Sequence, residues 1–251
     1  MIWSFINTGF HTGKYNMNYD LRLAADCKPN EAILRLYRWA PYCISLGANQ
    51  SFENIDKKKA KEDNLDIVKR PTGGRAVLHS EELTYSVIYP IDSATSAHTL
   101  YHQINMALAK GLMIYDDKLS GVDLENVQPD FLSLYRNDKA SAVCFAVPSK
   151  NELKLSGRKL VGSAQRKLNN VILQHGSILT GTFHRKLADY LSLSEDEKEK
   201  IKNEVKRKTI ELETILNKKV DFERLSESIK RGFELYFNAE LIESGFLQTE
   251  N

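Results

Sequence analysis

The chain has 251 residues, of which 42% are hydrophobic, so it is long enough to bury a full core. Its 35 Lys and Arg against 33 Asp and Glu leave a formal net charge of only +2, which does not favour nucleic-acid binding driven by a global field. No stretch approaches the roughly 18 consecutive apolar residues that a membrane span requires.

Taken in chain order, apolar and alternating segments predict strands at residues 3–6, 32–37, 42–46, 67–69 and 83–89. Helical spacing of apolar residues predicts helices at 15–26 and 98–114, and a charged segment at 57–63 favours another. Residues 119–139 are polar and irregular, which is typical of a loop. Further strands are predicted at 142–145, 152–155, 159–166 and 171–179.

From about residue 183 the pattern changes to helices, with Ser194 and Asp221 as candidate caps. Strands therefore come in antiparallel runs rather than in strict alternation with helices. We expect an α/β protein of the α+β type, with a mainly antiparallel sheet and flanking helices. We expect one domain over residues 1–251 with a helical C-terminal region.

The three cysteines are Cys27, Cys43 and Cys144. An odd, sparse set without a CxxC pair indicates neither a disulfide framework nor a zinc site, so we expect no metal and a reducing compartment. The first residues lack a basic start followed by an apolar run, so they do not form a secretory signal. We expect a cytoplasmic protein that binds no nucleic acid and no membrane.

Residues 69–79 read KRPTGGRAVLH and form the first candidate binding segment. Gly73 and Gly74 permit backbone angles closed to other residues and let the main chain approach a ligand. Exposed N–H groups in such a turn can hold an anion or a carbonyl oxygen, and Arg70 and Arg75 flank it. Taken alone, two glycines between strands more often mark a plain hairpin turn.

Three residues between positions 141 and 179 are chemically suggestive but ambiguous one by one. Cys144 lies between apolar neighbours, where a lone cysteine is usually a small buried hydrophobe. Lys159 begins an apolar strand, and a lysine there usually points outward because turning it inward without a partner would be costly. His175 interrupts an apolar run, and a lone histidine is more often structural than catalytic.

Taken together, the segments that contain these residues are specific, because they match the pattern of a known family. The segments KRPTGGRAVLH, ELTYSV, GRKLVGSAQ and LQHGSIL together resemble the biotin and lipoate protein ligase family, over residues 3–237. The segment SAVCFAVPSKNELKLSGRKLVGSAQ resembles the cysteine-dependent octanoyl-[acyl-carrier-protein]:protein N-octanoyltransferases. ATP-using ligases of the family tend to have a third glycine where Arg75 stands. Ser80 departs from the family, which often has an aspartate after the histidine.

The resemblance implies an acyltransferase of lipoate biosynthesis that moves octanoyl from acyl carrier protein to a lysine of a lipoyl-type domain, such as glycine cleavage H protein. It implies that Cys144 forms the thioester and that Lys159 either activates this cysteine or binds the acyl carbonyl. It implies no cofactor, since the octanoyl or lipoyl group is the substrate. The expected substrate-binding residues are Arg70, Gly73, Gly74, Arg75, Val77, His79, Gly162, Ser163, Ala164, Gln165, His175 and Gly176.

Three alternatives stay open at the level of sequence. The chain could be an ATP-dependent lipoate–protein ligase, in which Lys159 would contact the acyl-adenylate and Cys144 would be incidental. It could be an amidotransferase that moves lipoyl or octanoyl groups between lipoyl domains with the same cysteine. It could also be a non-catalytic acyl-binding module, although the presence of both Cys144 and Lys159 argues against that.

Overall fold

A computed structural model describes residues 1–91, 96–124 and 152–244. Its main sheet has the strand order β10 (Val161–Leu168), β11 (Val171–Leu179), β6 (Glu82–Pro90), β2 (Glu31–Trp39), β1 (Ile2–His11) and β12 (Leu241–Glu243). The pairings from β10 through β11 and β6 to β2 are antiparallel, whereas β1 runs parallel to both β2 and β12. The predicted α+β class with a mainly antiparallel sheet is confirmed, in a mixed form.

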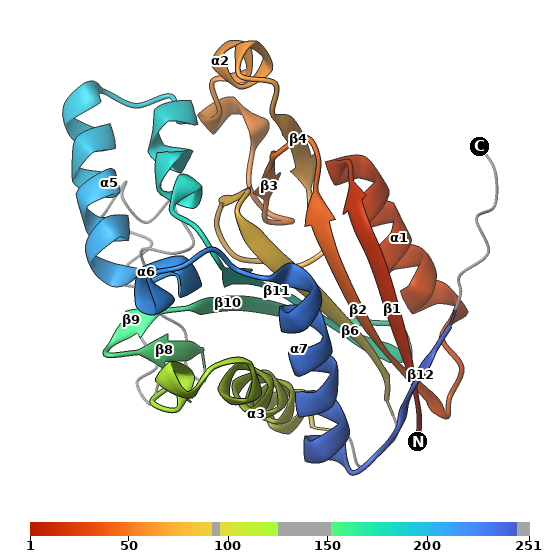
Figure 1. The fold of residues 1–251 in the computed structure, drawn as a ribbon. Helices are drawn as coiled ribbons and strands as arrows, with labels where there is room; N and C mark the ends of the chain where they lie inside the picture. Colours follow the sequence, from red (N-terminus) through yellow and green to blue (C-terminus); the bar gives the residue numbers. More distant parts are fainter. Residues whose placement is uncertain (92–95, 125–151, 245–251) are drawn as a thin grey trace.

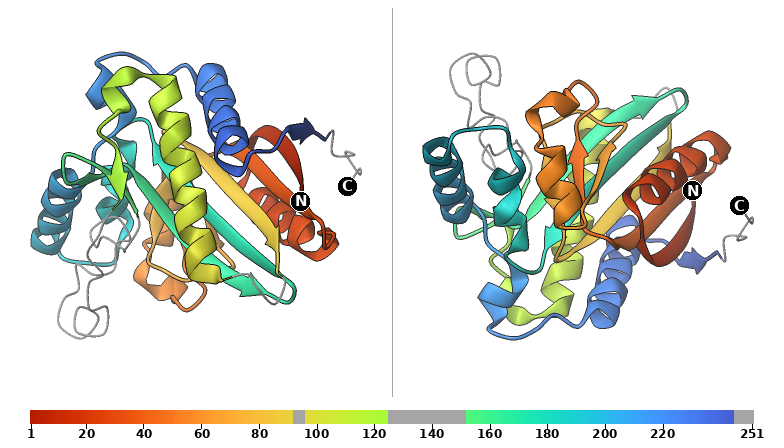
Figure 2. Two further views of the ribbon diagram at one scale, coloured as in Figure 1. Left: turned by 90° about the horizontal axis from the view of Figure 1, so that it is seen from below. Right: turned by 90° about the horizontal axis from the view of Figure 1, so that it is seen from above.

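Helices cover both faces of this sheet (Figures 1 and 2). Helix α1 (Gly13–Asp26) packs on one face, while α3 (Ala97–Tyr115) and α7 (Phe222–Phe237) pack side by side on the other. Successive side chains of a strand point to opposite faces, so Leu34 joins the α3–α7 core while Ile33 joins the core under α1. Strand β2 is consequently buried along almost its whole length.

Side-chain caps explain where the main helices begin. Thr12 accepts a hydrogen bond from the third residue of α1, and Ser96 does the same for α3. Ser194 forms a capping box with Glu197 at the start of α5 (Glu195–Lys208), and Asp221 caps α7. The caps predicted at Ser194 and Asp221 are therefore confirmed.

Two smaller sheets flank the main one. The first has the order β4 (Asp66–Lys69), β3 (Cys43–Leu46) and β5 (Val77–His79), and it shares a core with η5 (Phe183–Tyr190) and α5. The second has the order β7 (Asp123–Leu124), β8 (Leu153–Leu155) and β9 (Arg158–Lys159). The remaining short elements are η1 (Phe52–Asn54), α2 (Lys57–Glu62), η2 (Asp117–Leu119) and α6 (Leu212–Leu216).

The structure corrects one expectation around Lys159 and shows which way its side chain points. The strand predicted at 159–166 is divided, because β9 ends at Lys159 and β10 begins at Val161. The lysine side chain is buried rather than outward, since the carboxylate of Glu152 lies 2.8 Å from its Nζ and compensates its charge. The predicted loop beyond residue 124, the strand predicted at 142–145 and Cys144 itself lie outside the described residues. No helix in the described part of the chain is both long and apolar enough to cross a membrane.

The contact between α3 and α7 depends on two facing glycines, Gly111 and Gly232. A Cβ atom built on Gly232 would lie closer to the backbone of Gly111 than real Cβ atoms come to their neighbours, and the reverse holds at Gly111 with the backbone of α7. The two helix backbones therefore approach so closely that neither position has room for a side chain.

Gly232→Ala should lower the free energy of unfolding by about 1–3 kcal/mol, because the added methyl must push the helices apart in a packed core. Urea denaturation measures this. Glu227→Ala, at an exposed position of the same helix, is the control and should change stability by no more than about 0.5 kcal/mol. Equal stability of Gly232→Ala and wild type would show that the close helix approach is not required.

Candidate active site

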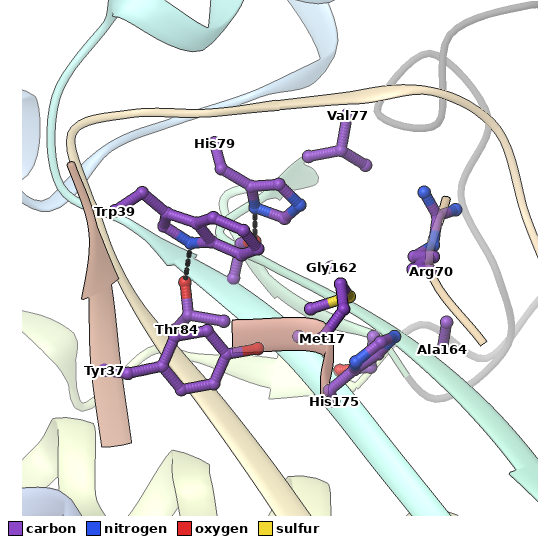
Figure 3. Close-up of a pocket in the computed structure, with 13 residues that line it drawn as sticks. Met17, Tyr37, Trp39, Arg70, Val77, His79, Thr84, Gly162, Ala164 and His175 are labelled. Atoms are coloured by element: carbon purple, nitrogen blue, oxygen red, sulfur yellow. Dashed lines mark hydrogen bonds between the residues drawn. The ribbon is translucent and has the colours of Figure 1, made fainter. Parts of the chain in front are cut away.

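A narrow pocket with a cavity volume of about 40 Å³ opens where the main sheet meets the segment that follows β4. Figure 3 shows the rings of Tyr37 and Trp39 on one side of it and Arg70 with Ala164 on the opposite side. The lining residues are Met17, Tyr37, Trp39, Arg70, Val77, His79, Thr84, Gly162, Ser163, Ala164, His175, Gly176 and Ser177.

The pocket wall brings together many of the residues singled out in the sequence. Those that line it are Arg70, Val77, His79, Gly162, Ser163, Ala164, His175 and Gly176. Gly73, Gly74, Arg75, Gln165 and Lys159 are not among the lining residues. Within the described part of the chain, no group of three or more His, Cys, Asp and Glu side chains is placed to hold a metal ion.

Beneath the pocket, the fully buried carboxylate of Asp20 joins helix α1 to the sheet. Its Oδ1 lies 2.7 Å from the buried guanidinium of Arg35 and accepts a hydrogen bond from Ser86 at 2.8 Å. Its Oδ2 accepts one from the Tyr37 hydroxyl at 3.3 Å. Burial alone would raise the pKa of Asp20, but Arg35 and His175 together hold it below its ordinary value.

His175 links this carboxylate to the segment that follows β4. Its Nδ1 lies 3.7 Å from Asp20 Oδ2, and its Nε2 lies 2.6 Å from the hydroxyl of Thr72. Burial lowers the pKa of His175 in spite of the neighbouring carboxylate. The neutral ring therefore bridges α1 and the glycine-containing turn through one nitrogen on each side.

Arg70 holds the same turn from its other end. One guanidinium nitrogen donates to the carbonyl oxygens of Gly73 and Arg75, at 2.9 and 2.7 Å, and the other donates to Ser45. Gly74 has a φ of +92°, a conformation that residues with a side chain rarely adopt. The buried guanidinium of Arg70 thus fixes the turn, and the positive φ at position 74 favours glycine there.

A second buried carboxylate, Glu82, organises the wall around His79. His79 Nδ1 lies 2.8 Å from Glu82 Oε1, and the same oxygen accepts hydrogen bonds from Thr84 and Ser177 at 2.6 and 2.7 Å. His79 stacks on Trp39 with their ring centroids 4.1 Å apart, as Figure 3 shows. Burial alone would raise the pKa of Glu82, but His79 and these hydroxyl donors hold it below its ordinary value.

The back of the pocket is held by Ser163 on β10. Its Oγ lies 2.6 Å from the hydroxyl of Tyr85, which accepts a further bond from Gln174 at 3.0 Å. Tyr101 of α3 donates to the backbone carbonyl of Ser163 at 3.3 Å. These contacts fix the β10 backbone at the pocket, so the wall formed by Gly162, Ser163 and Ala164 is rigid.

Sequence reasoning missed the residues that support the pocket. Met17, Tyr37, Trp39, Thr84 and Ser177 line it, and Asp20 and Glu82 organise its polar groups. One signal was available, because Arg35, Tyr37 and Trp39 recur with the strand period of two and so share one face of β2. No pattern in the sequence marks Asp20 or Glu82, since Asp20 pairs with the distant Arg35, and Ser177, one of the partners of Glu82, is also distant.

The fold is shared with enzymes that handle lipoate. A lipoate-protein ligase A bound with ATP is 19% identical to this chain, with a TM-score of 0.75 over 99% of this chain and 90% of that one. A bi-partite lipoate protein ligase from Thermoplasma acidophilum, solved in a study of the ligase and its E2 lipoyl domain, is also 19% identical. Its TM-score is 0.77 over 99% of this chain and 89% of that one.

The family model of the lipoyl protein ligase A/B catalytic domain matches residues 12–234, and the chain belongs to this family. Relatives named Octanoyltransferase LipM match almost its whole length. That of Clostridioides difficile is 33% identical over 99% of this chain and 92% of its own. Those of Staphylococcus aureus and Bacillus subtilis are 36% and 34% identical, each over 95% of this chain and 88% and 87% of their own lengths.

Asp20→Asn should lower the free energy of unfolding at pH 7 by about 3–5 kcal/mol, because it leaves the Arg35 guanidinium buried without a counter-charge. Because the pKa of Asp20 is lower in the folded chain than its ordinary value of 3.8, its stabilisation is present above that value and is lost as the pH falls through the folded pKa.

Urea denaturation at pH 7 and at pH 3 tests this. The difference between wild type and Asp20→Asn should be largest at pH 7 and smaller in acid. The exposed Asp26, at the end of the same helix, provides the control, and Asp26→Asn should match wild type at both pH values. A stability of Asp20→Asn equal to wild type at pH 7 would contradict the role given to Asp20.

Proposed function

We propose that this chain is an octanoyltransferase of lipoate biosynthesis that takes octanoyl from acyl carrier protein and passes it to a lysine of a lipoyl domain. The observation that carries this proposal is the 33–36% identity to octanoyltransferases over almost the whole chain. We further propose glycine cleavage H protein as one such acceptor, and a thioester on Cys144 as the intermediate.

In the first half-reaction, the thiolate of Cys144 attacks the carbonyl carbon of the octanoyl thioester on the carrier. A C–S bond to the enzyme forms, the C–S bond to the carrier breaks, and the carrier leaves as its thiol. An ordinary cysteine with a pKa near 8.5 is only a few per cent ionised at neutral pH, so a nearby cation favours the reactive form. The sequence resemblance assigns this position to Lys159.

In the second half-reaction, the uncharged ε-amine of the acceptor lysine attacks the enzyme thioester. The C–N bond forms, the C–S bond breaks, and the sulfur recovers as a thiol the proton that the nitrogen loses. An amide is more stable than a thioester, so the sequence of two steps needs no nucleotide. Backbone N–H groups near Gly74 or Gly162 are the proposed donors to the carbonyl oxygen as it gains charge.

The pocket supports a medium-chain acyl substrate. The side chains of Met17 and Val77 and the rings of Tyr37 and Trp39 offer an apolar surface in a narrow space. Many polar groups around it already form hydrogen bonds with one another, as Glu82 does with His79, Thr84 and Ser177. An unbranched hydrocarbon chain can therefore enter this space without displacing their partners.

Cys144→Ala should abolish octanoyl transfer to a lipoyl domain in an assay that contains octanoyl-carrier and no ATP. Gel-shift or mass measurement of the acceptor gives the rate. Cys27→Ala and Cys43→Ala should transfer at near wild-type rates, because burial raises the thiol pKa of Cys27 to about 11 and raises that of Cys43 well above its ordinary value.

Two results would contradict the proposal. Near-normal transfer by Cys144→Ala would exclude the cysteine as the acyl carrier. Strict dependence of the wild type on ATP and free lipoate, with no transfer from octanoyl-carrier, would instead identify a lipoate ligase that works through an acyl-adenylate.

A further inference from the structure

Gly47 directly follows strand β3, and Gln50 fixes both polar atoms of its backbone. The N–H of Gly47 donates to the side-chain oxygen Oε1 of Gln50 at 3.0 Å, and its carbonyl accepts from the backbone N–H of Gln50 at 2.9 Å. Gly47 does not adopt the positive φ that favours glycine. A requirement for glycine at this position therefore comes from the space around its α-carbon.

The glycine-containing turn fills that space. A Cβ atom built on Gly47 would overlap the carbonyl oxygen of Gly74 and would lie 2.9 Å from its carbonyl carbon. Both are backbone atoms, so no rotation of a side chain can relieve the overlap. The next residue adds a hydrogen bond, from the N–H of Ala48 to the carbonyl of Thr72 at 2.9 Å. The residues after β3 and the turn are therefore in direct backbone contact.

Arg70 contacts the same turn. Its guanidinium donates to the carbonyls of Gly73 and Arg75, at 2.9 and 2.7 Å. These two carbonyls flank that of Gly74, which packs on Gly47. Four successive carbonyls of the turn thus have a fixed contact, two with Arg70 and two with the residues after β3. Because a peptide unit is planar, the turn cannot shift at one of these carbonyls without disturbing its neighbours.

These contacts reach the pocket through Arg70. Arg70 lines the pocket opposite Tyr37 and Trp39 (Figure 3), whereas Gly47 and Gln50 are not among the lining residues. Arg70 is 5% exposed, so its guanidinium depends on the carbonyls of the turn as acceptors. If the turn moved, the guanidinium would have to follow these acceptors or lose them. The shape of the pocket wall therefore depends on where the turn lies.

We propose that Gly47 and Gln50 are positioning residues for the acyl substrate. The bare α-carbon of Gly47, fixed by Gln50, sets the place of the turn and thereby of Arg70 in the pocket wall. This inference rests on the proposed function, in that the pocket takes the octanoyl chain. Neither residue lines the pocket, so both act through the turn.

Gly47→Ala tests the steric part of this role. The added methyl must displace the Gly74 carbonyl, and kcat/KM for octanoyl-carrier should fall about 100-fold, since a misplacement of about 1 Å has an effect of this order. The affinity for octanoate, measured by calorimetric titration, should fall as well. Gly121→Ala is the matched control, because a Cβ atom there meets only the side chain of Leu155 at 3.4 Å, and it should match wild type in both measurements.

Two variants of Gln50 separate positioning from a loss of stability. Gln50→Ala removes the acceptor of the Gly47 N–H without adding volume, so kcat/KM and the affinity for octanoate should each fall several-fold. Gln50→Glu keeps an oxygen acceptor and should restore both to near the wild-type values. A merely structural role would lower the urea midpoint of Gln50→Ala and leave the kcat/KM of the folded protein unchanged.

The inference and the proposed function fail by different results. A folded Gly47→Ala variant with wild-type kcat/KM and octanoate affinity overturns the inference, as do equal values for Gln50→Ala and Gln50→Glu. A wild type that binds octanoate but transfers none from octanoyl-carrier overturns the function, while loss of octanoate binding in Gly47→Ala still supports the positioning role. A wild type that neither binds octanoate nor transfers octanoyl overturns both.

Discussion

The carboxylate of Asp20 is the contact on which the pocket depends. It is fully buried, so the fold tolerates it only because Arg35, Ser86 and Tyr37 supply donors and a counter-charge. Those donors come from strands β2 and β6, while Asp20 itself belongs to α1. One charged group thus fixes a helix against the sheet directly beneath the pocket. It also fixes His175, which reaches the pocket wall from β11.

Two chains of polar contacts extend to the glycine-containing turn, one from Asp20 and one from Glu82. One runs from Asp20 through His175 to Thr72. The other runs from Glu82 through His79 and Ser45 to Arg70, whose guanidinium holds the turn carbonyls. Because both chains are buried, moving the turn would leave several polar groups unpaired. The structure therefore presents the turn in a preorganised shape, as a site for acyl transfer requires.

The sequence predicted the architecture where local pattern is strong. The helix at 98–114 and the strand at 171–179 have clear periodicity, and both correspond to elements of the structure, α3 and β11. Strands β5 and β12 have three residues each, too few for a period to be recognised. The direction of β1, parallel to β2, is set by tertiary packing and has no local signature.

At the candidate site too, the sequence indicated local motifs but not the contacts that tertiary packing creates. The motifs at positions 69–79, 157–165 and 173–179 pointed to segments that line the pocket, because together they resemble those of the biotin and lipoate protein ligase family. The burial of Lys159 could not be predicted, since the usual outward orientation is reversed by one carboxylate seven positions earlier. Asp20 and Glu82 were missed for a similar reason: a buried acid is recognisable only by its partners, and Arg35 and Ser177 come from other elements of the fold.

The central claim is that the enzyme itself carries the acyl group between donor and acceptor. A chase experiment tests it most directly. The chain is acylated with octanoyl-carrier, the carrier is removed, and an unmodified lipoyl domain is added without nucleotide. One octanoyl group should leave the enzyme and appear on the lipoyl domain, at a rate no slower than overall turnover. Octanoyl that stays on the enzyme, or that moves only when carrier is present, would contradict it.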